Sequence, residues 1–92
     1  MQIKVRFTGI VRHYTKDTGK SYELPEGARV SDLLIRVGRD YGPRLPEQMW
    51  DPQEERFNPL IKATRRGSPI PEENDELKEG DEIYVISRMA GG

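Results

Sequence analysis

The sequence predicts an α+β fold, in which one main α-helix packs on one face of a mixed sheet of four or five strands. Three observations predict it. Apolar residues alternate along residues 2–8, they recur with a helical period over residues 28–42, and they form a continuous run at residues 83–86. Strand segments on both sides of a single helical segment are typical of a sheet that is covered by a helix on one face.

The first two predicted strands form a hairpin. Ile3, Val5 and Phe7 share one face of the first strand, and the residues between them are polar. Residues 13–20 supply turn chemistry, and residues 21–27 are predicted to form a second strand that ends in a proline and a glycine. We therefore expect a β-hairpin at the start of the chain.

The apolar stripe over residues 28–42 indicates an amphipathic helix, the one helix that the sequence predicts clearly. Its members are Val30, Leu33, Leu34, Val37 and Tyr41. Ser31 is the expected N-cap, Asp32 favours the first turn, and the Gly-Pro pair at residues 42–43 stops the helix. Gly38 costs a helix interior about 1 kcal/mol relative to alanine. We therefore expect close packing against the sheet to require this glycine.

Residues 43–59 form a long connection with four prolines and no clear period. A short helical turn near residues 47–50 is the one element expected there. Met49 and Trp50 admit two interpretations. Large aromatic side chains are mostly buried, which favours a pair that caps one end of the core. The alternative is an exposed anchor for a partner protein.

The remaining predicted strands follow this connection. Residues 60–63 are predicted to form a strand, a turn follows at residues 66–67, and a short edge segment ends in prolines. Apolar residues on both faces of residues 83–86 indicate a central strand that is covered on both sides and runs to about Ser87.

The composition indicates one small domain. The chain has 92 residues, and its hydrophobic and charged fractions are equal at 34%. We expect a β-sheet domain over residues 1–87 and a flexible C-terminal arm over residues 88–92. The chain has no cysteine, which excludes disulfides, a thiolate nucleophile and a cysteine metal site. No apolar run approaches the roughly 18 residues of a membrane span, and the first residues do not resemble a signal peptide. We expect a cytoplasmic protein without a membrane partner.

The charges are unevenly placed. Residues 1–66 hold 13 basic and 9 acidic residues, whereas residues 67–92 hold 2 basic and 7 acidic residues. The acidic residues gather between Glu72 and Glu82, where they form either a solvated face or a docking surface for a basic partner. No basic cluster is interleaved with aromatic residues, so nucleic acid is not an expected partner.

The sequence does not predict an enzyme. His13 is the single histidine, and it lies beside a predicted turn. A catalytic base needs an orienting partner and a cleft, so this histidine is expected to be incidental. The chain has no Ser-His-Asp set, phosphate-binding loop or metal-ligand spacing. We expect neither a bound metal nor a bound cofactor.

The diglycine Gly91-Gly92 is the strongest functional signal. A C-terminal glycine carboxylate is the least hindered acyl group that a protein offers, but it reacts only after activation, for instance as a mixed anhydride with AMP. Gly92 would supply the acyl group, and Gly91 would let the backbone enter a narrow site. An extended arm advances ~3.3 Å per residue, which carries Gly92 clear of the domain.

Two motifs resemble one family. The segment "LKEGDEIYVI" at residues 77–86 and the final "AGG" at residues 90–92 resemble the MoaD/ThiS sulfur carriers, which include the small subunit of molybdopterin synthase and the sulfur carrier of thiamine biosynthesis. This resemblance implies a ubiquitin-like β-grasp fold. It also implies that Gly92 bears the sulfur, with Gly91 as its small neighbour.

The resemblance implies three partners as well. A ubiquitin-activating-like adenylyltransferase would adenylate Gly92 with ATP, which this chain itself does not bind. A sulfur donor would convert the adenylate to a thiocarboxylate. An acceptor synthase, such as the large subunit of molybdopterin synthase, would receive the sulfur in cofactor biosynthesis.

Alternatives remain at this point. A ubiquitin-like protein modifier would use the same Gly92 to form isopeptide bonds with lysines, and a β-grasp binding module would not use it at all. Molybdopterin-type carriers usually have a Pro-Pro pair where this chain has residues 87–89, and thiamine-type carriers have a shorter connection than residues 43–59. The molybdopterin, thiamine, cysteine and transfer-RNA pathways therefore all stay open.

Overall fold

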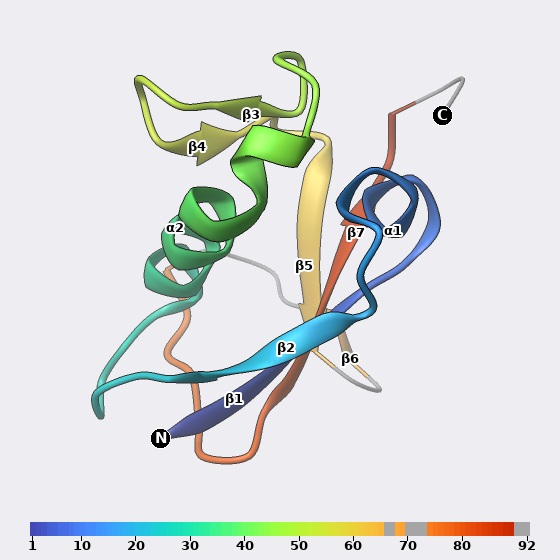
Figure 1. Cartoon of the computed structure of the whole chain (residues 1–92). Helices are drawn as coiled ribbons and strands as arrows, with labels where there is room; N and C mark the ends of the chain where they lie inside the picture. Colours follow the sequence, from blue (N-terminus) through green and yellow to red (C-terminus); the bar gives the residue numbers. More distant parts are fainter. Residues whose placement is uncertain (66–67, 70–73, 90–92) are drawn as a thin grey trace.

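The structure of the protein is a computed structural model that describes residues 1–65, 68–69 and 74–89 (Figure 1). Its elements, in chain order, are β1 (Gln2–Phe7), α1 (Gly9–Thr15), β2 (Gly19–Glu23), α2 (Val30–Tyr41), the 3₁₀-helix η1 (Gly42–Arg44), β3 (Trp50–Asp51), β4 (Arg56–Phe57), β5 (Ile61–Arg65), β6 (Ser68–Pro69) and β7 (Glu82–Ser87).

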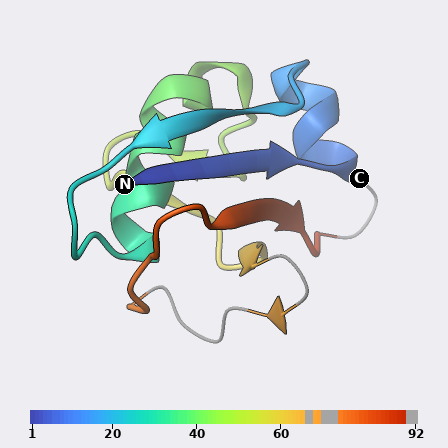
Figure 2. The ribbon, with the colours of Figure 1, turned by 90° about the horizontal axis from the view of Figure 1, so that it is seen from below.

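The main sheet is mixed and has five strands in the order β2-β1-β7-β5-β6. β1 and β7 are parallel, and the other neighbouring pairs are antiparallel. Helix α2 lies across one face of this sheet, as Figures 1 and 2 show from two directions. The predicted α+β arrangement with one main helix on a mixed sheet is confirmed.

The core lies between α2 and the two central strands. Ile3, Val5 and Phe7 of β1 point into it, as their alternation predicts. Ile83 and Val85 of β7 are fully buried beside them. The predicted stripe of α2 is buried at every position: Val30, Leu33, Leu34, Val37 and Tyr41.

Strand β7 is central, as predicted, but it is covered on one face only. Tyr84 and Ile86 lie on the face away from α2 and are half-buried. Their register partners Arg6 and Lys62 stand beside them, and long aliphatic stems of this kind shield neighbouring apolar groups. The prediction of a strand covered by a layer on both faces is therefore wrong. On the face away from α2, neighbouring side chains of the same sheet shield the apolar residues only in part.

The connection between β1 and β2 is a helix, not the predicted turn. β1 and β2 do pair antiparallel, but the seven-residue helix α1 links them. Val11 and Thr15 lie four residues apart on one face of α1, and both are buried. Lys16 ends the helix in the left-handed region (φ 55°), where its N–H donates to the Arg12 carbonyl over 2.9 Å.

Side chains from α2 and η1 hold α1 in place. The Tyr41 hydroxyl donates to Asp17 Oδ2 over 2.9 Å, and the Gly19 N–H donates to Asp17 Oδ1 over 3.0 Å. Arg44 Nη1 donates to the Thr15 carbonyl over 2.7 Å, which satisfies the C-terminal end of α1. The Gly19 amide and then the Tyr41 hydroxyl lower the pKa of the Asp17 carboxyl. Burial, followed by the bond to Asp17, raises the pKa of Tyr41 to about 12.

Helix α2 begins two residues earlier than predicted. Arg29, not Ser31, is its N-cap, and the Arg29 N–H donates to Asp32 Oδ2 over 2.8 Å. The Val30 N–H donates to the Asp75 carbonyl over 2.9 Å. A backbone acceptor from a distant segment thus satisfies one of the free N–H groups at the helix start. No local sequence signal predicts such a partner.

The long connection contains a small sheet that the sequence does not predict. β3 and β4 pair antiparallel, and the Trp50 and Phe57 rings meet edge to face with centroids 4.8 Å apart. The predicted turn before β3 is present, because the Met49 N–H donates to the Pro46 carbonyl over 2.9 Å. Both predicted cap residues are buried, so the exposed-anchor interpretation is wrong.

Trp50 explains the glycine inside α2. A Cβ atom on Gly38 would lie 2.1 Å from the Trp50 ring, and one on Gly42 would lie 2.4 Å from it. Close packing at Gly38 is therefore confirmed, but its partner is Trp50 and not the main sheet. The indole covers the side of α2 that would otherwise face solvent.

The contact with Trp50 predicts that Gly38→Ala destabilises the fold. Overpacking against the ring should lower the free energy of unfolding by about 1–3 kcal/mol, measured by urea denaturation. In a Trp50→Leu background the same change should be neutral or stabilising by up to about 1 kcal/mol, because alanine favours a helix. An equal effect in both backgrounds would contradict this explanation.

The Asp17 network predicts a pH-dependent stability difference. Asp17→Asn should lower the free energy of unfolding by about 1 kcal/mol at pH 7. Because folding lowers the pKa of Asp17, this stabilisation is present above the ordinary carboxyl pKa and is lost as the pH falls through the folded value. The gap between variant and wild type should therefore narrow below about pH 4. Glu47→Gln, at an exposed carboxylate, is the control. If the difference in the free energy of unfolding stays constant from pH 7 to pH 3, the charge of Asp17 does not cause it.

Candidate functional site

The two predicted site residues, Gly91 and Gly92, lie outside the described residues, as does Ala90. The described chain runs to Met89. The predicted boundary between a domain over residues 1–87 and an arm over residues 88–92 stays a prediction. The structure describes the place from which the arm starts, which we call the arm root (residues 87–89).

The arm root is attached to the domain by hydrogen bonds and packing. The Arg88 N–H donates to the Leu60 carbonyl over 2.8 Å, just before β5. The Met89 N–H donates to Ser87 Oγ over 3.1 Å, and the Met89 side chain packs against the core. These contacts hold the chain through Met89, so whatever follows starts from a fixed position.

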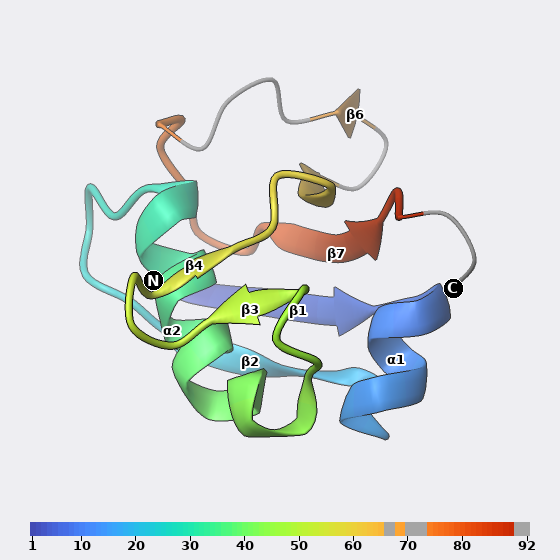
Figure 3. The same cartoon turned by 90° about the horizontal axis from the view of Figure 1, so that it is seen from above.

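Helix α1 lies next to the arm root. β1 and β7 are parallel, so both end at the same edge of the sheet, and β1 leads directly into α1. Figures 2 and 3 show the end of β7 beside the start of α1. Arg12 and His13 of α1, and Lys16 directly after it, are exposed. His13 is expected from the sequence to be incidental, and no sequence motif singles out the two cations.

The acidic residues lie at the opposite end of β7. Asp81 immediately precedes β7, and its carbonyl accepts the Lys4 N–H over 2.9 Å near the start of β1. The Gly80 N–H donates to the Gln2 carbonyl over 2.9 Å. A strand of six residues spans about 20 Å, so these acidic residues lie about that far from the arm root.

The described acidic residues therefore lie away from the arm root, and a docking surface for a basic partner there stays a prediction. Several of them also pair with cations of the same chain. Asp81 pairs with Arg65 over 3.2 Å, and Glu76 with Arg29 over 3.7 Å. Glu72 and Glu73 lie outside the described residues.

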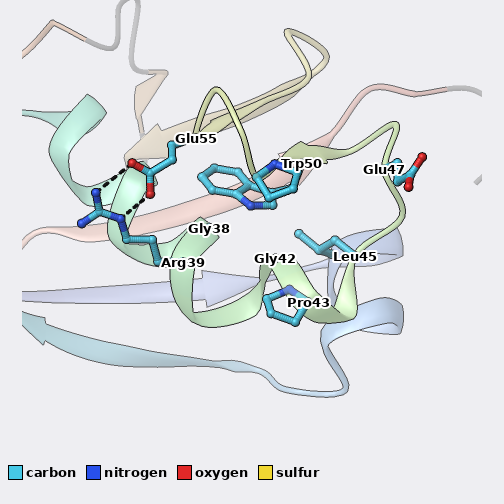
Figure 4. Close-up of a pocket in the computed structure, with 9 residues that line it drawn as sticks. Gly38, Arg39, Gly42, Pro43, Leu45, Glu47, Trp50 and Glu55 are labelled. Atoms are coloured by element: carbon cyan, nitrogen blue, oxygen red, sulfur yellow. Dashed lines mark hydrogen bonds and ion pairs between the residues drawn. The ribbon is translucent and has the colours of Figure 1, made fainter.

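A shallow groove of about 350 Å³ lies beside α2, where Trp50 packs on Gly38 and Gly42 (Figure 4). It is lined by Gly38, Arg39, Gly42, Pro43, Leu45, Glu47, Trp50, Pro52 and Glu55. Arg39 donates to both carboxylate oxygens of Glu55, and this pairing lowers the pKa of Glu55. The groove has no base with an orienting partner, and its charged pair is already satisfied.

The described residues contain neither a candidate metal site nor a helix that could cross a membrane. No three of its histidine, aspartate and glutamate side chains are placed to hold a metal ion. No helix in residues 1–65 or 74–89 has the length and apolar character that crossing a membrane requires.

Comparisons with known proteins show which proteins this chain is similar to. The molybdopterin synthase sulfur carrier subunit of Chlamydomonas reinhardtii is 28% identical over 92 residues, which cover all of both chains. SAMP1 of Haloferax volcanii, a small archaeal modifier protein, superposes with a TM-score of 0.80 at 15% identity over all of both chains.

A second solved structure, a putative molybdopterin converting factor subunit 1 from Pyrococcus furiosus, superposes with a TM-score of 0.70 at 23% identity. It covers 95% of this chain and 97% of that one. At these identities the two structures establish the ubiquitin-like β-grasp fold. The family is established separately, by a match to the ThiS family over residues 5–92. The chain belongs to the ThiS family.

Proposed function

We propose that this protein is a sulfur carrier whose Gly92 is adenylated and then converted to a thiocarboxylate. The observation that carries the proposal is the family match, which extends through Gly91 and Gly92. The relative from Chlamydomonas reinhardtii, which aligns over its full length, is named a sulfur carrier subunit. The arm root supports the proposal, because it holds the start of the arm at one edge of the sheet.

The chemistry takes two steps, both catalysed by partner proteins. The Gly92 carboxylate attacks the α-phosphorus of ATP, and pyrophosphate leaves. Hydrosulfide supplied by the sulfur donor then attacks the Gly92 carbonyl carbon. The new C–S bond forms as the bond to AMP breaks, AMP leaves with the electron pair, and loss of the sulfur-bound proton gives the thiocarboxylate. Glycine suits both steps because it has no side chain to obstruct the reacting carbon.

Three partners follow from this chemistry. A ubiquitin-activating-like adenylyltransferase binds the ATP, so this chain needs no cofactor of its own. A sulfur donor supplies the second step. The name of the relative suggests an acceptor synthase, the large subunit of a molybdopterin synthase, as the third. The protein then acts as a co-substrate or subunit, not as an enzyme.

The alternative is a protein modifier that forms an isopeptide bond between Gly92 and lysines of other proteins. The fold similarity to a small archaeal modifier protein favours it. Both functions require the same adenylation of Gly92. They differ only in the nucleophile that attacks the adenylate.

Reconstitution tests the carrier function. The chain, its cognate adenylyltransferase, ATP and a sulfur donor should yield a product in which one oxygen of Gly92 is replaced by sulfur, detected by intact-mass spectrometry. A variant that ends at Gly91 should show no mass change. Its free energy of unfolding should match that of wild type, because no described contact of the domain depends on Gly92. If the adenylyltransferase releases pyrophosphate but no sulfur appears on Gly92, the result would count against the carrier function.

Cell extracts separate the two functions. A carrier should appear as the free protein, whereas a modifier should appear in higher-mass conjugates that vanish when Gly92 is deleted. Immunoblotting of extracts from cells that express each form provides the measurement. Conjugates that depend on Gly92 would favour the modifier over the carrier.

A further inference from the structure

Charge is segregated along the direction of β7. Acidic residues precede this strand, where Glu76 pairs with Arg29 and Asp81 with Arg65. At the other end of the strand lie the arm root and the start of helix α1. The exposed basic residues Arg12, His13 and Lys16, on α1 and directly after it, define what we call the α1 basic surface. The two ends of β7 therefore differ in charge, although the net charge of the chain is only −1.

The cations of α1 are available to a partner. Arg12 and Lys16 form no ion pair with any residue in the described ranges, whereas Arg6 pairs with Glu82 over 3.1 Å and Lys20 with Asp40 over 3.0 Å. Within the described residues, the hydrogen bonds of Arg12 are made by its backbone: its N–H donates to the Thr8 carbonyl over 3.3 Å, and its carbonyl accepts from the Lys16 N–H over 2.9 Å. Its guanidinium contributes nothing to the described interior, so the fold does not explain its charge.

The α1 basic surface is held in a fixed position. Val11 and Thr15 bury one face of α1, Asp17 ties the following residues to Tyr41, and Arg44 closes the helix end. Binding to a preformed surface avoids the cost of ordering it. The one carboxylate in residues 8–18, Asp17, accepts hydrogen bonds from Tyr41 and Gly19 and forms no ion pair with Arg12 or Lys16.

We propose that the α1 basic surface docks onto an acidic surface of the adenylyltransferase and so directs the arm into the site that adenylates Gly92. This inference rests on the proposed function. The adenylyltransferase is the partner to which it applies, because the carrier and the modifier both require adenylation. Helix α1 begins beside the end of β7 and the arm root, so a partner that binds the arm also meets α1 (Figure 3).

The charge separation also sets the orientation of docking. An acidic partner surface attracts the α1 end and repels the opposite end, which carries Asp75, Glu76 and Glu79. Electrostatic attraction of this kind raises association rates and specificity more than final affinity. A carrier needs that combination, because it must bind its activating enzyme quickly and then leave to deliver its sulfur.

Charge reversal tests the proposal. The rate of pyrophosphate release is measured as a function of the concentration of the full-length chain, with its cognate adenylyltransferase and saturating ATP. Arg12→Glu should raise the KM for the chain about tenfold, as expected for the loss of a close charge pair across an interface. The value of kcat should change little, because Gly92 and the reaction site are untouched. Arg12→Gln should show a smaller effect in the same direction.

Lys78→Glu is the matched control. Lys78 is exposed at the acidic end of the molecule, and its replacement changes the net charge by the same amount. Its KM should stay near that of wild type. Added salt should raise the KM of wild type and reduce the difference between wild type and Arg12→Glu, because salt screens exposed charges. Urea denaturation confirms that each variant is folded.

The outcomes separate this inference from the proposed function. If wild type releases pyrophosphate and Arg12→Glu behaves like Lys78→Glu, the docking proposal is overturned while the proposed function stands. If wild type is not adenylated at all by an active enzyme, the proposed function fails, and the docking proposal fails with it. A selective rise in KM for the Arg12 variants supports both.

Discussion

The parallel pairing of β1 with β7 is the constraint on which the rest of the structure depends. Lys4 to Phe7 align with Glu82 to Val85, so the first and last strands end at the same edge of the sheet. β1 continues into α1, and β7 continues into the arm root. One register therefore places helix α1 beside the arm root and leaves the acidic segment at the far end. An antiparallel pair would have put the acidic segment beside α1 instead.

The sequence predicts the elements that bury many side chains with a regular period. Alternation in β1 and the stripe of α2 depend on local spacing, and both are confirmed. Helix α1 is too short to show a period, since only Val11 and Thr15 are buried and Ile10 packs partly against the core. The hairpin around Trp50 has strands of two residues each, and Trp50 packs on Gly38 and Gly42 of the preceding helical segment, a contact that no periodic pattern marks. Tertiary contacts decide both segments.

The candidate site divides in the same way. Gly91 and Gly92 come from the sequence alone, because their chemistry depends on residue type and on their place after the last strand. Arg12 and Lys16 could have been noticed as exposed cations in a segment with no neighbouring acid before Asp17. Their relation to the arm could not, because it arises from the pairing of strands about 80 residues apart in the chain. The same pairing leaves the acidic residues that precede β7 at the opposite end of the strand, although they lie close to the arm in the sequence.

The measurement that tests the central claim most directly is the mass of the protein isolated from its own cells. We predict a population in which the last residue is Gly92 and one oxygen of its carboxylate is replaced by sulfur, with the sulfur assigned to Gly92 by fragmentation. Protein that carries no sulfur on Gly92 under conditions in which the sulfur donor is active, or a mature chain that does not end at Gly92, would contradict the claim.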